Sequence, residues 1–237
     1  MAIHSSILVH WTGNSGEDDI EKKFRDDEKT RAEKYVERLK DDYEKGLYAQ
    51  KKLEASIRYW NVRSVKICFT EIRLSQTHVH AERYGKLGIG FSRQFILDRG
   101  GRPVIYVPFE PKKDGKLLES SIDDLRQYSE MHKEIKNAVD SIMAHVVRMS
   151  PDGKGNGDEL YEEMEWRLVH DGSLANTHFA QDTGNDVYRL RFEPRDIKVI
   201  IFPNETTQQM ALQDKTLSDF FAKHMPIMAT LEDCSNF

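Results

Sequence analysis

The chain has only two cysteines, no long apolar run and no excess of positive charge, and each shortage excludes a class of protein. Cys68 and Cys234 are too few for a disulfide framework of the kind that stabilises small secreted domains. No stretch approaches the roughly 18 consecutive apolar residues of a transmembrane helix. The first residues also lack the basic start and long apolar centre of a secretion signal. We therefore expect a cytoplasmic protein that neither spans a membrane nor is exported.

The composition is typical of a folded protein with solvated helices. Hydrophobic residues make up 38% and charged residues 32% of the 237 residues, a balance unlike that of a disordered chain. The formal net charge of −5 gives no overall attraction to nucleic acid, which requires concentrated positive charge. A local basic patch within 63–102 is the remaining route to nucleic acid. Its members are Arg63, Lys66, Arg73, Arg83, Lys86, Arg93, Arg99 and Arg102.

Short β-rich runs and longer amphipathic segments follow one another without regular βαβ alternation. The predicted strands cover 6–11, 65–70, 87–91, 103–108, 163–168, 186–192, 197–202 and 226–231. Helical periodicity covers 18–57, 118–146 and 206–224. This order predicts a single α+β domain over 1–237, with a largely antiparallel sheet of short strands and long flanking helices.

The segment 17–59 is dense in charge, with apolar residues recurring every three or four positions. This pattern predicts one or two long amphipathic helices. Alternating charge signs are typical of a solvated helix face, and a partner or nucleic-acid surface is the alternative.

The run from Glu163 to Leu168 alternates polar and apolar residues. In a strand, Glu163, Glu165 and Arg167 share one face, while Met164 and Trp166 point to the other. Two carboxylates beside a guanidinium could bind hydroxyl groups and stabilise a developing sugar cation. A charge-paired strand face without chemistry explains the same residues.

His10 and Thr12 emerge together where the first predicted strand ends. A histidine there could bond to a ribose or act as an acid or base near neutral pH. A local cap for the following turn is the alternative.

The segment 75–86 reads as a polar loop between two strands, where sites often lie. His78 and His80 have the spacing of two metal ligands on one strand face, with Glu82 as a third, but nothing elsewhere completes the set, so we expect no metal. Gly85 and the glycines after it lack the order of a phosphate loop and indicate close backbone approach. We interpret Cys68, in an apolar strand, as inert packing. Any chemistry is therefore predicted between 68–107 and 163–167.

Several of these runs carry a resemblance to a known family. The motifs CFTEI (68–72), HAERYGKLGIGF (80–91), GGRPVIYV (100–107), YEEMEWR (161–167) and FEPRDIKVIIFP (192–203) resemble the AbiGi family of bacterial abortive-infection proteins. The likeness extends to residues 6–12. It implies a role in phage defence, and members of the family are often labelled antitoxins. Residues 17–59 depart from the family, which implies a charged helical insertion that binds a partner such as a cognate toxin.

A wider resemblance is to proteins with an ADP-ribosyltransferase-like fold. It implies that His10 and Thr12 contact the ribose of NAD, with Tyr84 near nicotinamide. Glu165 would bind a ribose hydroxyl and stabilise the transition state. Glu163 would orient an acceptor, and Arg167 would add a further contact to NAD.

Three functions compete on this basis. The first is an NAD-dependent ADP-ribosyltransferase or NAD glycohydrolase, with NAD as its substrate. The second is a non-catalytic antitoxin or sensor that holds a partner toxin through the 17–59 helices. The third is a defence protein that binds nucleic acid at the 63–102 patch.

Overall fold

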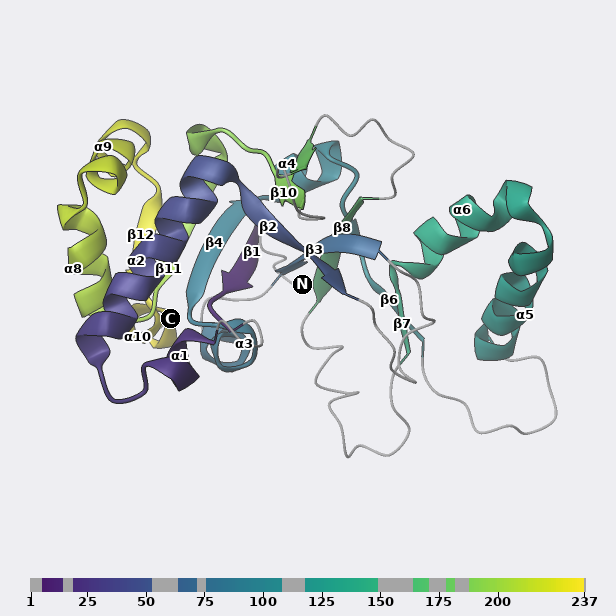
Figure 1. Ribbon diagram of the computed structural model, residues 1–237, viewed down its shortest axis with the longest axis horizontal. Helices are drawn as coiled ribbons and strands as arrows, with labels where there is room; N and C mark the ends of the chain where they lie inside the picture. The colour runs from purple at the N-terminus through teal and green to yellow at the C-terminus, as the bar shows by residue number, and fades with distance from the viewer. Residues whose placement is uncertain are drawn as a thin grey trace.

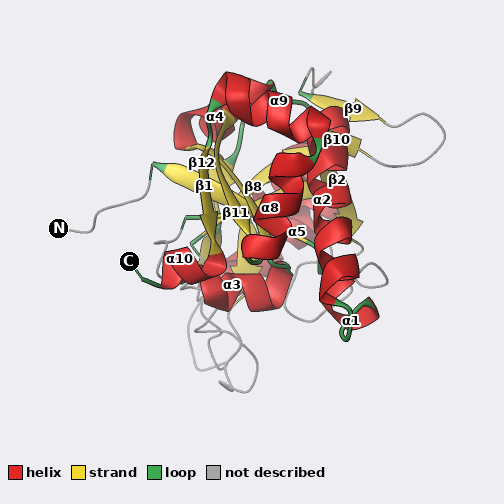
Figure 2. Ribbon diagram, turned by 90° about the vertical axis from the view of Figure 1, so that its left-hand side faces the viewer, coloured by secondary structure: helices red, strands yellow, loops and turns green. Residues whose placement is uncertain are grey.

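The structure is a computed structural model that describes residues 6–14, 19–52, 64–71, 76–107, 118–148, 164–170, 178–181 and 188–236. These residues form a mixed α+β fold in which a large sheet carries helices on both faces (Figures 1 and 2). The expected fold class is confirmed, since the described ladders of this sheet are antiparallel apart from the β11–β12 pair. Among the described residues, no helix is long and apolar enough to cross a membrane.

The sheet branches at one strand. Its order runs β12-β11-β4-β1-β3-β2-β10-β9, and β3 also pairs with β8, which pairs in turn with β5. The strands of the branch region are β1 (Ile7–Thr12), β2 (Leu47–Lys52), β3 (Ser64–Thr70), β5 (Arg102–Pro103) and β8 (Glu165–His170). The others are β4 (Leu87–Ser92), β9 (Phe179–Gln181), β10 (Tyr188–Leu190), β11 (Ile197–Phe202) and β12 (Ile227–Thr230).

The larger core lies on what we call the first face of the sheet. Leu8, Phe69 and Phe91 point into it and are fully buried. Its helical cover comes from α2 (Glu28–Lys45), α4 (Arg93–Asp98), α8 (Glu205–Gln213) and α9 (Lys215–His224), while α1 (Ile20–Lys23) adds Ile20 and a short 3₁₀ turn, η3 (Pro194–Asp196), precedes β11.

The second face carries a smaller core under α3 (Thr77–Tyr84) and α10 (Leu231–Ser235). Val9 and Trp11 of β1 contribute to it, and β4 places Gly90 there. A Cβ atom on Gly90 would lie 2.3 Å from Cγ1 of Val199, so the missing side chain lets β11 residues pack over β4. Gly90 therefore serves close packing of side chains, whereas the close backbone approach predicted for this run occurs at Gly85, where a Cβ atom would lie 2.2 Å from the Thr12 carbonyl oxygen.

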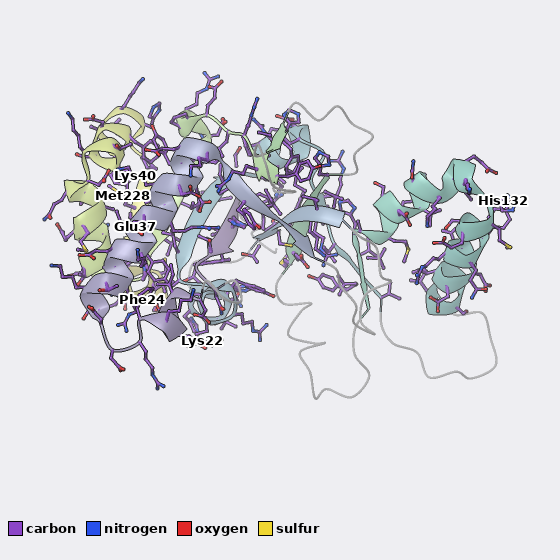
Figure 3. All side chains as sticks on the ribbon, in the orientation of Figure 1. Lys22, Phe24, Glu37, Lys40, His132 and Met228 are labelled. Carbon is purple, nitrogen blue, oxygen red and sulfur yellow. The ribbon has the colours of Figure 1, made fainter. Side chains whose placement is uncertain are left out.

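The described part of the segment 17–59, residues 19–52, belongs to the main fold. Helix α2 buries Tyr35 and Leu39 in the first-face core and leaves charged residues such as Glu37 and Lys40 toward solvent (Figure 3). The predicted helix over 18–57 is too long, because the chain reverses into β2 at Gly46. A Cβ atom there would lie 2.3 Å from the Leu190 carbonyl oxygen, and φ is +94°.

A separate unit stands away from the main sheet (Figure 1). It consists of β6 (Ile105–Val107), α5 (Leu118–Met131), α6 (Lys133–Met143) and β7 (Val146–Arg148), with β6 parallel to β7. Val107, Val139, Met143 and Val146 form its own small core, against which Ile122 and Ile135 pack. The helix predicted over 118–146 is confirmed, but it breaks at His132 into two.

Candidate functional site

Glu165 begins β8, and Arg167 holds its carboxylate from two residues further along. Arg167 donates from Nε to Oε1 at 2.8 Å and from Nη2 to Oε2 at 3.0 Å. The Arg167 and Glu165 side chains are 3% and 12% exposed. Arg167 also donates from Nη1 to the Ala144 carbonyl at 2.8 Å, at the end of α6. The two side chains share a strand face as predicted, but they form a buried pair instead of a solvent-facing row.

The Glu165 carboxylate is ionised at neutral pH. Burial by itself would raise its pKa, but the Arg167 guanidinium, a hydrogen bond from the Cys68 thiol and the charge of Lys66 outweigh burial and lower the pKa. An ionised carboxylate can stabilise positive charge and accept hydrogen bonds from hydroxyl groups. It cannot supply a proton as a general acid.

Backbone strain lies directly before this carboxylate. Met164 has φ of +43°, in the left-handed region that side-chain-bearing residues rarely adopt. The Glu165 N–H donates to the Tyr106 hydroxyl at 3.1 Å, and the Glu165 carbonyl accepts from Val104 N–H at 2.8 Å. The surrounding contacts therefore hold the chain in a conformation that costs about 1–3 kcal/mol, a feature that clusters at functional sites.

Cys68 lies opposite Arg167 in the β3–β8 pair and presents its thiol to Glu165. Burial, together with the Glu165 charge, raises the pKa of Cys68 to about 12. The thiol is therefore protonated and acts as a hydrogen-bond donor. It is not a nucleophile, which agrees with its interpretation as an inert strand residue.

His10 lies where the sheet branches. β8 occupies one edge of β3, so β1 and β2 must share the other edge. On that edge β2 pairs with residues 64–66, and the described β1–β3 register has one pair, Val9 with Thr70. The ladder opens between them, and His10 fills the opening: its Nδ1 lies 2.9 Å from the Cys68 carbonyl oxygen.

The His10 imidazole is neutral at physiological pH. Burial lowers its pKa to about 4; the hydrogen bond to the Cys68 carbonyl opposes this shift, and the Arg38 charge adds to it. A neutral ring that donates from Nδ1 keeps Nε2 as an acceptor. His10 can therefore bind a hydroxyl group, but it is not a ready proton donor.

His10 and Glu165 contact different atoms of Cys68 on opposite sides of the sheet. The His10 ring bonds to its carbonyl oxygen and packs against Phe69 on the first face, with ring centroids 5.9 Å apart. Glu165 reaches its thiol on the second face. Strand alternation therefore directs the Glu165 and His10 side chains to opposite faces of the sheet. His10 lies at the edge of β3, where β1 and β2 separate.

The other predicted site residues lie elsewhere or outside the described part. Thr12 is buried at the far end of β1, and Tyr84 is exposed at the end of α3. The two are linked through Gly85, where a Cβ atom would lie 2.2 Å from the Thr12 carbonyl oxygen. Glu163 lies outside the described residues.

The prediction of a polar loop at 75–86 is wrong over α3. A helix separates residues two apart by about 200°, so His78 and His80 cannot share a face as they would on a strand. His80 is buried, and burial lowers its pKa to about 4, whereas His78 is exposed. The described residues contain no group of three or more His, Cys, Asp or Glu placed to hold a metal ion.

The described members of the 63–102 basic group do not form one patch. Lys66 is buried beside Glu165, and Lys86 pairs with Glu21. Arg93 pairs with Glu71, which also accepts from Trp166 Nε1 at 2.9 Å. Arg63 and Arg73 lie outside the described residues.

Two charged residues near the site, Arg38 and Asp42, were not predicted from the sequence. Arg38 of α2, whose charge acts on His10, donates to Asp42 at 3.1 Å. Asp42 is fully buried, and burial raises its pKa to about 6 against the opposing charge of Arg38. An i,i+4 Arg–Asp pair in a charged helix is ordinarily a surface pair, so no sequence signal marked it.

The sequence of this chain matches the model of a known protein family. The family model described as "Putative abortive phage resistance protein AbiGi, antitoxin" matches residues 35–203. This chain belongs to the AbiGi family. The match includes Glu165, Arg167 and Cys68, whereas His10 and Thr12 precede it. It also includes residues 35–59, so the second part of α2 and all of β2 belong to the AbiGi region.

Other comparisons add little. No curated protein matches the sequence. Among solved structures, Thermus sp. 2.9 DarT in complex with NAD+ is similar at 12% identity and a TM-score of 0.39, covering 97% of this chain and 96% of that chain. A similarity of that size is too low to assign the chain to that fold.

Proposed function

We propose that this AbiGi-family chain acts in the cytoplasm in abortive-infection phage defence, as an enzyme that cleaves NAD and either hydrolyses it or transfers ADP-ribose. The observation that carries the proposal is the ionised carboxylate of Glu165, which follows the strained backbone at Met164. Two hydrogen bonds from Arg167 fix this carboxylate on the second face of the sheet.

The reaction breaks the bond between the nicotinamide nitrogen and C1′ of the ribose, and the electron pair leaves with nicotinamide. Positive charge then spreads over C1′ and the ring oxygen, and a negative group beside it lowers the barrier. In our proposal Glu165 supplies that charge and binds a ribose hydroxyl. Water or a hydroxyl of an acceptor attacks C1′ and loses its proton to solvent.

The other predicted residues differ in whether they can take part. His10 and Thr12, which the resemblance assigned to the ribose, have their side chains on the first face of the sheet, so they do not reach the ribose that Glu165 binds on the second face. Tyr84 contacts nicotinamide, and Glu163 orients the acceptor. Arg167 keeps the Glu165 carboxylate ionised and aimed, so it is a positioning residue that can also contact NAD.

Nicotinamide release by the purified protein tests this directly. Glu165→Gln keeps the shape of the side chain but removes its charge, and we expect a loss of about 10²-fold or more, the usual effect of deleting one transition-state contact. Glu37→Gln, an exposed carboxylate of α2 that Figure 3 labels, is the matched control and should keep full activity. Circular dichroism must show that both variants are folded. Equal release by Glu165→Gln and the unaltered protein, or no binding of millimolar NAD, would contradict the proposal.

A partner-holding antitoxin is the second candidate, and the description of the matched AbiGi model favours it. The sequence placed the partner on the 17–59 helices. The apolar residues of helix α2 are packed in the core, so a partner that binds this helix would contact its charged residues. This candidate predicts that Glu165→Gln still protects cells from the cognate toxin and forms a stable complex with it. Loss of protection with this variant, while the complex persists, would exclude it.

A further inference from the structure

The unit formed by α5 and α6 exposes several large apolar side chains within a short stretch of the chain. We call these residues the hairpin stripe: Leu118, Leu125, Tyr128, Met131 and Ile142. They are between 41% and 74% exposed. Together with Ile105 of β6, they make up half of the exposed large hydrophobic residues in the described chain. Such clustering marks interaction surfaces, whereas single exposed apolar residues need no explanation.

The stripe extends an apolar side of the hairpin that the small core covers only in part. The helices already bury Val139 and Met143 in the small core, with Ile122 and Ile135 packed against it. Leu118, Leu125 and Tyr128 of α5 follow one another at seven- and three-residue spacings, which align side chains along one side of a helix. Ile122 lies four residues after Leu118 and three before Leu125, so the apolar side of α5 that packs on the small core continues into solvent.

Contacts at the break join the two helices into a hairpin that presents this side. His132 lies at the break between the helices (Figure 3). The Tyr128 ring stacks on it, with ring centroids 4.0 Å apart. Lys136 of α6 bonds to Glu130 of α5 and pairs with Asp140. A preformed surface loses little conformational entropy on binding.

Charge decides what kind of partner suits the stripe. The segment 118–143 contains six acidic and three basic residues, a net charge of −3 in 26 residues of a chain whose total is −5. Two copies of the hairpin would repel each other, which disfavours self-association through this side. A basic partner is attracted by the same charges, and an apolar helix face flanked by Lys and Arg matches the stripe in both respects.

We propose that the hairpin stripe is a docking surface for a basic amphipathic helix of another protein. The inference does not depend on NAD cleavage. It rests on the partner-holding candidate and assigns its contact to α5 and α6 instead of the 17–59 helices. The unit that carries the stripe adjoins the candidate site, because Arg167 donates to the Ala144 carbonyl at the end of α6 and the Glu165 N–H donates to the Tyr106 hydroxyl of β6.

A photo-crosslinking amino acid at position 128 tests the proposal in the full-length chain, expressed in infected host cells. The matched control carries the same amino acid at position 227, an exposed residue of β12 outside the stripe. Sequencing of the crosslinked peptides by mass spectrometry should identify, at position 128 only, a helical segment with an apolar face and flanking Lys and Arg. Capture of a second copy, an acidic segment, nucleic acid or lipid, the same products at both positions, or no product would overturn the proposal.

The captured segment, made as a peptide, supplies a second measurement. We expect Leu125→Asp to weaken its binding about tenfold or more, as for a central apolar contact, and added salt to weaken it further. Leu212→Asp, at a similarly exposed leucine of α8, should leave the affinity unchanged. Equal affinities of both variants would refute the assignment. Nicotinamide release is measured separately, so failure of the docking surface and failure of the proposed enzyme remain distinguishable.

Discussion

Replacing Arg167 by methionine should destabilise the protein strongly, because it leaves the Glu165 charge buried without its partner. The two side chains are 3% and 12% exposed and are joined by two hydrogen bonds of 2.8 and 3.0 Å. They therefore belong with buried pairs, for which removal of one member costs about 3–5 kcal/mol, and not with surface pairs worth about 0–1 kcal/mol. Methionine keeps most of the apolar stem, so the loss reports mainly the charge.

The double variant Arg167→Met, Glu165→Gln separates charge from packing. Removing the stranded carboxylate should restore part of the loss, with an interaction energy of about 1–3 kcal/mol. Urea unfolding followed by tryptophan fluorescence measures both, since Trp166 lies between the two residues and is buried. An unchanged dependence on urea concentration would show that the denatured state is the same.

The pH dependence supplies the sharpest check of this reasoning. The pKa of Glu165 is lowered in the folded protein, so its contribution to stability is present above its unfolded pKa and is lost as pH falls through the folded pKa. Without Arg167, burial raises the pKa of Glu165 instead. Protonation of Glu165 in mild acid then removes the buried charge and with it the free-energy cost of that charge. The deficit of Arg167→Met should therefore shrink from pH 7 to pH 4. A deficit that is constant with pH and not reduced in the double variant would refute a buried ion pair.

Three further predictions concern single residues. The pKa of Asp42 is raised to about 6, so its contribution to stability is present below the ordinary pKa of 3.8 and is lost as pH rises through 6; the loss should reach about 3 kcal/mol by pH 7, and Asp42→Asn should flatten that slope in urea unfolding across pH. Gly90→Ala should cost about 1–3 kcal/mol because its Cβ would meet Val199 at 2.3 Å, and adding Val199→Ala should recover part of the thermal stability, whereas no recovery would exclude the clash. The pKa of His10 is about 4, so NMR of its ring nitrogens should show a neutral imidazole from pH 5.5 to 8, and a titration near 6.5 would contradict its burial.

The local sequence pattern predicted the secondary structure correctly where the apolar residues follow a single period. The alternation in β8 correctly assigned Glu165 and Arg167 to one side and Trp166 to the other, because successive strand residues must point to opposite faces. The strands β3, β4 and β11 were predicted within about one residue for the same reason. The prediction of a loop over α3 was wrong. This helix buries only Thr77, His80 and Ala81, so its sequence is mostly polar and lacks a clear apolar period.

By itself, then, the sequence determined the fold class, most strands and the face on which each strand residue lies, since these follow from spacing along the chain. Only the tertiary structure decided that Glu165 is buried against Arg167, and that His10 bonds to Cys68 some 58 positions away. Those contacts depend on which strands meet at β3 and where the ladder opens. The same holds for the hairpin stripe, because periodicity marks α5 as amphipathic, while three-dimensional packing decides which of its apolar residues remain exposed.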